Sequence, residues 1–255
     1  MPSHADHWTS PDGSITLYRG EAIETLLALD PIGADLCTAD PPYSSGGLFK
    51  GDRDLDARGK YAQSGVSHFA NFTGDNRDGR SFAFWSTMWM QRAARHLKPG
   101  GYAQVFADWR QLPTTTDTVQ AAGLVWRGVL AWNKGRGSRA PHKGYHRHQC
   151  EYVVWASKGK LPKATHAGPF DGCFTHPVRQ SDKHHLTGKP TALLQDLIEV
   201  VPPGGLVFDP FMGSGTAGVA AARRGLRFVG IELDPHYFQV SVDRIAATIA
   251  ERKAA

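Results

Sequence analysis

A carboxylate, two prolines and an aromatic ring follow one another at Asp40, Pro41, Pro42 and Tyr43. Prolines fix φ and lack a backbone N–H, so this turn is stiff and its carbonyl oxygens are free to accept hydrogen bonds. Asp40 and the Pro41 carbonyl could accept both hydrogens of an exocyclic base amine and stabilise positive charge that develops on it. Tyr43 could stack on a base that has left the duplex. The same four residues could also form an ordinary turn after a strand.

A glycine-containing loop lies between an apolar run at residues 206–208 and a helix-like run that starts at residue 215. Gly213 and Gly215 would let the backbone approach a ligand closely, and the helix start would offer free amides. Glu232 follows Gly213 by 19 residues, close to the spacing at which an acid binds ribose hydroxyls in doubly wound folds. The pattern fits S-adenosylmethionine and a dinucleotide alike, although Val219 stands near where a dinucleotide motif has its third glycine.

Strand-like and helix-like runs alternate along the chain, which predicts an α/β fold around a mostly parallel sheet. Both motifs then follow strands, where open α/β sheets bind ligands. Asp234 and Pro235 predict the start of the last helix. We expect strands at 14–18, 34–39, 102–107, 124–132, 151–156, 206–208 and 227–231, and helices at 82–97, near 114–122, from about 190, at 215–224 and from 235. Four tryptophans in these elements are expected in the core: Trp85, Trp89, Trp126 and Trp132.

The net charge of +5 is concentrated in one part of the chain. Residues 127–163 hold nine Lys or Arg residues and a single acid, Glu151. Such a cluster is either a solvated loop or a surface that binds a polyanion, and charge alone fits both interpretations.

The three cysteines are scattered without a CxxC pair, so we expect no disulfide framework and a reducing cytoplasm. No apolar run approaches the roughly 20 residues that cross a bilayer, and residues 1–7 show no secretory signal. Three histidines between residues 142 and 148 lack an acid or cysteine at ligand spacing, so no metal site is expected.

Taken together, the motifs resemble those of the β group of amino-methyltransferases, in which the catalytic motif precedes the cofactor motif. Residues 40–43 resemble the catalytic motif, and residues 209–216 resemble the loop that binds the methionine part of the cofactor. Further family segments are matched, in order, by residues 20–22, 132–134, 151–159 and 189–194. The resemblance covers most of the chain, although Glu21 stands where the family usually has Asp.

The resemblance implies a doubly wound, Rossmann-like methyltransferase sheet of seven strands, one of them antiparallel, in a permuted motif order. Residues 1–255 would form a single methyltransferase domain, with a loop insert at 44–80 and a DNA-facing target-recognition region at about 134–188. The implied catalytic residues are Asp40, Pro41, Pro42 and Tyr43. The implied residues that bind S-adenosyl-L-methionine are Glu21, Ala22, Asp40, Lys189, Asp209, Phe211, Gly213, Ser214, Gly215, Thr216 and Glu232. No metal is implied, because methyl transfer from a sulfonium needs alignment more than acid–base chemistry.

With a base-modifying site implied, we favour the interpretation of the basic segment as a surface that follows DNA phosphates. The expected contacts come from Lys134, Arg136, Arg139, Lys143 and Arg147. Double-stranded DNA is therefore the expected partner. The short target-recognition region favours a homodimer or a short target site, and a cognate restriction endonuclease is a further candidate partner.

The favoured reaction is methylation of the N6 amine of a flipped adenine. Asp at the first position of the catalytic motif, here Asp40, is commoner in the family's adenine enzymes, and Ser in its cytosine enzymes. An N4-cytosine enzyme and an RNA or protein-amide methyltransferase of the same fold stay open, with the basic segment disfavouring a protein substrate. A dehydrogenase and a binding module without catalysis also stay open, although the intact motif residues argue against the latter.

Overall fold

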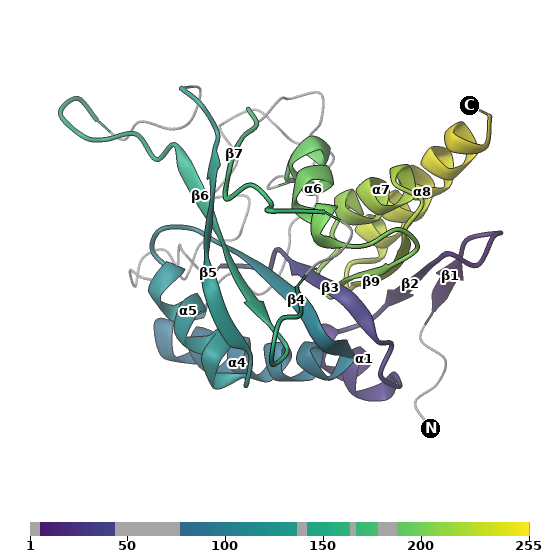
Figure 1. Cartoon of the computed structure of the whole chain (residues 1–255), viewed down its shortest axis with the longest axis horizontal. Coiled ribbons are helices and arrows are strands. Elements are labelled where there is room, and N and C mark those ends of the chain that lie inside the picture. The colour runs from purple at the N-terminus through teal and green to yellow at the C-terminus, as the bar shows by residue number, and fades with distance from the viewer. Residues whose placement is uncertain (1–5, 44–76, 137–141, 164–166, 178–187, 255) are drawn as a thin grey trace.

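The computed structural model describes residues 6–43, 77–136, 142–163, 167–177 and 188–254. These residues build a nine-stranded sheet with helices on both faces (Figure 1). The strands are β1 (His7–Thr9), β2 (Ile15–Arg19), β3 (Ala34–Ala39), β4 (Leu97–Ala107), β5 (Val125–Asn133), β6 (Cys150–Ser157), β7 (Cys173–Thr175), β8 (Leu206–Asp209) and β9 (Arg227–Glu232). The helices are α1 (Ala22–Ala28), α4 (Gly79–His96), α5 (Leu112–Ala121), α6 (Thr191–Leu197), the 3₁₀ helix η3 (Ile198–Val200), α7 (Thr216–Arg223) and α8 (Pro235–Ala254).

The strand order is β1-β2-β9-β8-β3-β4-β6-β5-β7. From β2 to β4 the neighbours pair in parallel, and β6 is antiparallel to both β4 and β5. These seven strands confirm the expected doubly wound sheet with one antiparallel strand. The three-residue strands β1 and β7 extend it at its edges, so the described chain has nine strands instead of seven. Runs of three residues are too short to show a strand pattern in the sequence.

Two helical layers cover the sheet. α1, α4 and α5 lie on one face, and α6, α7 and α8 lie on the other (Figure 1). All six residues of β3 are buried, as expected for a central parallel strand with helices on both sides. None of the helices in the described part of the chain is long and apolar enough to cross a bilayer.

The helix ends follow the expected local chemistry. The Asp234 carboxylate accepts hydrogen bonds from the amides of His236 at 2.8 Å and Tyr237 at 3.1 Å, which confirms the predicted start of α8. Asp78 caps α4 in the same way through the amides of Arg80 and Ser81. α1 was not expected, because its seven residues are shorter than the window over which helical periodicity is visible.

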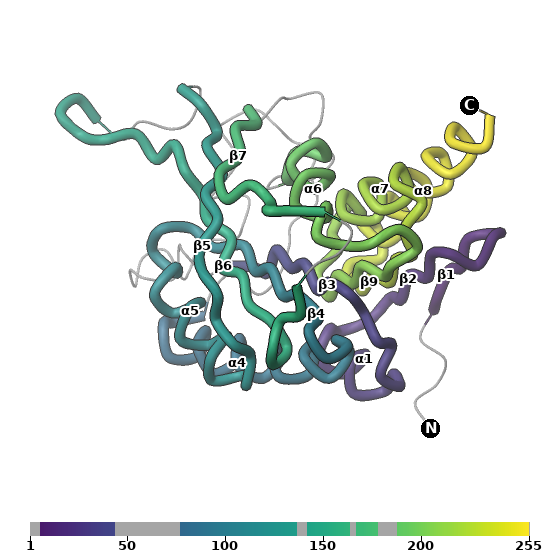
Figure 2. Tube along the Cα trace, in the orientation of Figure 1, coloured from purple at the N-terminus to yellow at the C-terminus, as the bar shows by residue number. Residues whose placement is uncertain are grey.

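Residues 142–149, which precede β6, project away from the sheet (Figure 2). Trp132 is buried near the end of β5, as expected. The prediction for Trp126 was wrong, because this side chain is 43% exposed. Trp126 lies in the half of β5 that precedes residues 131–133, which are the ones that pair with β7.

Candidate active site

The two sequence motifs meet at neighbouring strand ends. Asp40 follows β3, and Asp209 ends β8. β3 and β8 are parallel neighbours, with Cys37 opposite Phe208, so the residues that follow both strands emerge at the same edge of the sheet. Glu232 ends β9, the next parallel strand. The permuted order of the motifs is thus compatible with one shared site.

Both oxygens of the Asp40 carboxylate have a partner. Oδ1 accepts a hydrogen bond from the Tyr43 hydroxyl at 2.6 Å, and Oδ2 accepts one from the Lys189 ammonium at 2.6 Å. Burial and the nearby Asp40 carboxylate raise the pKa of Tyr43 well above its ordinary value. The hydroxyl therefore keeps its proton and acts as a donor. The contact fixes the orientation of the carboxylate relative to the tyrosine ring.

The ion pair at Asp40 continues into a chain of alternating charges. The Lys189 ammonium lies 3.6 Å from Glu151 Oε2, and Glu151 Oε1 lies 3.0 Å from the Lys134 ammonium. Burial alone would lower the pKa of Lys189, but the Asp40 and Glu151 carboxylates outweigh it and raise the pKa. For Glu151 burial would raise the pKa, but Lys189 and Lys134 outweigh it and lower the pKa. Lys189 and Glu151 therefore both keep their charge near neutral pH.

The structure gives two of these charged residues partners that the sequence did not indicate. Lys134 was expected to contact DNA, but its side chain is 19% exposed and paired with Glu151. Lys189 was expected to bind the cofactor, and the structure places it on Asp40. The sequence did not reveal these pairs, because the partners come from different strands and from residues that precede α6.

Glu232 holds the glycine loop. Its Oε2 accepts a hydrogen bond from the Gly213 amide at 2.9 Å, and its Oε1 accepts one from the Asp234 amide at 2.8 Å. Burial raises the pKa of Glu232 to about 7. Gly213 has a φ of +53°, and a Cβ there would point into open space. The loop therefore presents its backbone beside a carboxylate, an arrangement that suits a ligand with hydroxyl groups.

Asp209 and Phe211 form the inner part of the same loop. Asp209 is 6% exposed, and its carboxylate accepts a hydrogen bond from the Phe211 amide at 2.9 Å. Burial, together with the Asp40 and Glu232 carboxylates, raises the pKa of Asp209 to about 8. The Phe211 ring packs against Trp85 and Trp89, with ring centroids 5.6 and 4.9 Å apart. The tryptophans expected in the core thus support a predicted site residue.

The outer part of the loop is held by Arg244 of α8. Its guanidinium donates to the Ser214 carbonyl at 2.5 Å, to the Ser214 hydroxyl at 3.0 Å and to the Thr216 hydroxyl at 3.4 Å. Gly215 has a φ of +78°, and a Cβ there would lie 2.7 Å from the Cβ of Ser241. The Arg244 contacts could not be predicted, since no motif in the sequence links α8 to the glycine loop.

The segment at residues 20–22 lies beside the acid at the end of β9. Arg19 pairs with Glu232 across β2 and β9, and the Gly20 amide donates to the Glu232 carbonyl at 2.9 Å. Glu21 caps α1 by accepting a hydrogen bond from the Glu24 amide at 2.9 Å. Ala22 begins that helix and is buried. The structure therefore places this predicted segment next to Glu232.

The residues expected to contact DNA lie on or near the projecting segment. Arg136 and Lys143 are exposed, and Arg147 donates a hydrogen bond to the Arg136 carbonyl at 3.2 Å. Arg139 lies outside the described residues, as does most of the loop insert expected at 44–80. Near this segment the exposed ring of Trp109 stacks on His148, with centroids 5.7 Å apart.

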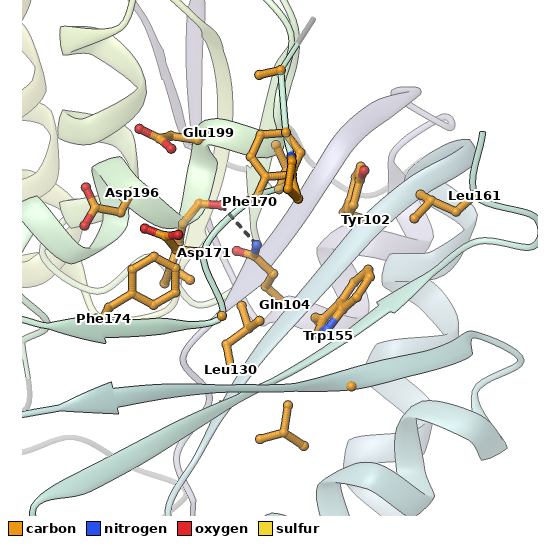
Figure 3. A pocket seen from close by; sticks show the side chains of 18 of the residues that line it. Tyr102, Gln104, Leu130, Trp155, Leu161, Phe170, Asp171, Phe174, Asp196 and Glu199 are labelled. Atoms are coloured by element: carbon orange, nitrogen blue, oxygen red, sulfur yellow. Dashed lines mark hydrogen bonds between the residues drawn. The ribbon is translucent and has the colours of Figure 1, made fainter. Parts of the chain in front are cut away.

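A separate cavity of about 820 Å³ lies over the middle of β4, β5 and β6. Tyr102 and Trp155 form one wall, and Asp171, Asp196 and Glu199 come from the opposite side (Figure 3). Gln104 at its floor donates a hydrogen bond to the Leu197 carbonyl at 3.0 Å. None of the charged residues around Asp40 lines this cavity, so it is distinct from the site at the strand ends.

Comparison with known proteins agrees with this geometry. Residues 34–243 match a model of the N6/N4 methyltransferase family, described as DNA methylase. The match spans most of the chain, which therefore belongs to the DNA methylase family, the β-group DNA amino-methyltransferases. YubD of Escherichia coli (strain K12) is 29% identical over 234 residues, covering 90% of this chain and 89% of YubD. The type II methyltransferase M2.DpnII of Streptococcus pneumoniae is 26% identical over 250 residues, covering 91% and 89%.

Solved structures share the fold. The complex of M1.HpyAVI with SAM is 22% identical and has a TM-score of 0.67, covering 91% of this chain and 98% of that one. The cytosine-N4-specific PvuII DNA methyltransferase is 18% identical and also has a TM-score of 0.67, covering 95% and 92%. These likenesses confirm the expected class of α/β fold.

Proposed function

We propose that this chain transfers a methyl group from S-adenosylmethionine to the N6 amine of an adenine that has flipped out of double-stranded DNA. The observation that carries the proposal is the position of the Asp40 carboxylate and the Tyr43 ring beside the strand end that bears the glycine loop. An acceptor for an amine and a backbone cradle for a cofactor thus lie at one edge of the sheet.

The described residues fit S-adenosylmethionine. The backbone of Gly213 borders open space, Glu232 offers carboxylate oxygens for ribose hydroxyls, and Phe211 offers an apolar wall supported by two tryptophans. Asp209, Ser214, Gly215 and Thr216 would shape the part of the loop that holds the methionine end. When bound, the cofactor supplies a methyl group activated on a sulfonium.

Asp40 and Tyr43 would prepare the base for the reaction. The amine of adenine is a poor nucleophile, because its lone pair is delocalised into the ring. Asp40 and the Pro41 carbonyl would accept its two N–H groups and stabilise the positive charge that develops on the nitrogen. Tyr43 would stack on the flipped base while its hydroxyl orients Asp40. Pro42 would keep the turn stiff.

Arg136, Lys143 and Arg147, which lie on or near the projecting segment, would contact DNA phosphates, and the sequence adds Arg139 to this set. Their number and position support a sequence-independent contribution to DNA binding. The region at about 134–188 would then face the DNA as the target-recognition region of a single methyltransferase domain. A short region of this kind favours a homodimer or a short target.

Mass spectrometry of nucleosides tests the reaction. DNA from a host that lacks its own base methylation would be isolated after expression of the wild-type chain or of Asp40→Ala. We expect N6-methyladenine with the wild type alone. An N4-methylcytosine peak would mean that the substrate is cytosine and not adenine. Both amines lie beside a ring nitrogen, so one catalytic geometry can serve either base. No methylated base in DNA, with methyl transfer to RNA in vitro, would favour the RNA alternative.

A further inference from the structure

The Lys189 ammonium is hydrogen-bonded to Asp40 Oδ2, an oxygen that the proposed reaction needs. Lys189 lies 2.6 Å from Asp40 Oδ2, and Tyr43 already holds Oδ1. An amine that approaches Asp40 must therefore share or displace the contact with the ammonium. Charge-assisted bonds of this length are among the stronger hydrogen bonds in proteins, so displacement without a new partner would be costly for a cation that is only 7% exposed.

A second acceptor for this ammonium is already in place. Glu151 Oε2 is buried and accepts no hydrogen bond from the described residues. It lies 3.6 Å from the Lys189 nitrogen, just beyond hydrogen-bonding distance, while Lys134 holds the other oxygen of the same carboxylate. A buried acceptor without a donor is unfavourable, so a small movement of Lys189 toward Glu151 would satisfy it.

Aromatic rings line the position of the ammonium. The Lys189 nitrogen lies 5.3 Å from the centroid of the Tyr43 ring and 5.1 Å from that of Phe106. Ring faces attract a cation without a fixed hydrogen-bond direction. Lys189 can therefore change its carboxylate partner without moving into a purely apolar environment.

We propose that Lys189 is a positioning residue that passes from Asp40 to Glu151 when the target amine binds, and that Glu151 is the acceptor that makes this exchange possible. The exchange moves no net charge out of the site, because the ammonium leaves one carboxylate for another. It frees Asp40 Oδ2 for an N–H of the base. This inference builds on the proposed amino-methyl transfer and assigns Glu151 a role that the sequence did not indicate.

Glu151→Gln is the direct test, since it keeps the shape of the side chain but removes the charge that receives the ammonium. We expect kcat/KM for DNA to fall about 10- to 100-fold, while the Kd for S-adenosylmethionine stays within about two-fold. The matched control is Glu251→Gln on the exposed end of α8, which should leave both values unchanged. Thermal melting would show that the variants are folded.

The double variant Glu151→Gln with Lys189→Met separates exchange from simple structural support. Without the ammonium nothing competes with the base for Asp40 Oδ2, so the double variant should be several-fold faster than Glu151→Gln alone. If Glu151→Gln does not fold, Glu151→Asp replaces it, and its shorter carboxylate should give a smaller fall that Lys189→Met again reverses in part.

The outcomes are distinguishable from failure of the proposed function. An inactive wild-type chain on DNA in the same assay would mean that the proposed function is wrong. An active wild type with an unchanged Glu151→Gln, or with a double variant as slow as Glu151→Gln or slower, would overturn the exchange while leaving the methyltransferase intact.

Discussion

Asp40 and Lys189 lie 149 positions apart in the sequence, yet the Lys189 ammonium donates a hydrogen bond to the Asp40 carboxylate at 2.6 Å. The contact joins the turn after β3 to the residue before Pro190, where α6 begins. It places a buried cation directly on the carboxylate on which the proposed reaction depends. The position of Asp40 is thus set by three elements: its own turn, the start of α6 and, through Glu151, the start of β6.

Binding of S-adenosylmethionine should stabilise the protein against heat, and NAD should not. A ligand present at a concentration of about 100 times its Kd adds roughly 2.7 kcal/mol to the free energy of unfolding. Gly213→Val should weaken this binding, because Gly213 has a φ of +53° and its missing side chain leaves the loop open. Calorimetric titration gives the Kd values, with Gly79→Val as a control at a glycine that has an ordinary φ and open space around it. Stabilisation by NAD alone would favour the dehydrogenase interpretation.

The buried carboxyl of Asp209 should make stability depend on pH. Its pKa is raised from 3.8 to about 8, so between these values the folded protein keeps a proton that the unfolded chain has lost. The free energy of unfolding therefore falls as the pH rises through this range. Asp209→Asn cannot ionise and keeps an oxygen for the Phe211 amide. We expect the free energy of unfolding of Asp209→Asn to exceed that of the wild type by roughly 1–3 kcal/mol at about pH 8 and by much less near pH 4.

Chemical denaturation without cofactor, repeated from about pH 5 to pH 9, measures this difference. A difference in the free energy of unfolding between Asp209→Asn and the wild type that grows with pH agrees with a buried neutral carboxyl. A difference that is the same at every pH would mean that Asp209 is ionised throughout.

The basic segment should contribute to DNA affinity without regard to sequence. The double variant Arg136→Gln with Lys143→Gln should bind all duplexes more weakly, whatever their sequence. Adding Arg139→Gln should weaken this binding further. The slope of log K against log salt should flatten by up to about 0.9 for each lost phosphate contact. Arg223→Gln with Lys253→Gln removes two charges from the ends of α7 and α8, far from this segment in Figure 1, and should leave the slope unchanged. The same slope for the Arg136 and Lys143 variant as for this control would mean that the segment faces solvent.

Tyr43 should contribute separately through its ring and its hydroxyl. Tyr43→Ala should lose roughly 1–3 kcal/mol of stacking on the flipped base, and Tyr43→Trp should keep part of it. Tyr43→Phe keeps the ring but removes the donor at 2.6 Å from Asp40, so it should lower kcat more than base affinity. Fluorescence of a 2-aminopurine placed at the target position reports base flipping, and initial rates report kcat. A Tyr43→Ala variant that flips the base normally would contradict the stacking role.

The strand ends that form the site could be predicted from the sequence for a physical reason. β3 and β8 are short, apolar and buried on both faces, so their limits are visible as limits of hydrophobic runs, and the motifs follow them directly. The seven central strands were all expected. β1, α1 and β7 were not, because elements of three to seven residues carry too little periodicity.

The contacts of the charged residues could not be predicted in the same way. A lysine in a basic stretch is compatible with DNA binding, and only the register of β5 and β6, which places Trp132 opposite Glu151, brings Lys134 beside that carboxylate. The hydrogen bond from Arg244 to Ser214 likewise depends on how α8 packs against the glycine loop. Side-chain partners of this kind depend on three-dimensional packing and leave no spacing signal in the chain.

The role of Asp40 as the acceptor of the target amine is tested most directly by single-turnover methyl transfer with radiolabelled S-adenosylmethionine. Asp40→Asn keeps the volume of the side chain, and Asp40→Ala removes it. We expect both to slow the transfer by at least about 10²–10³-fold, while cofactor and DNA affinities stay within a few-fold, because the carboxylate acts mainly in the transition state. Transfer by both variants at close to the wild-type rate would contradict the proposed role of Asp40.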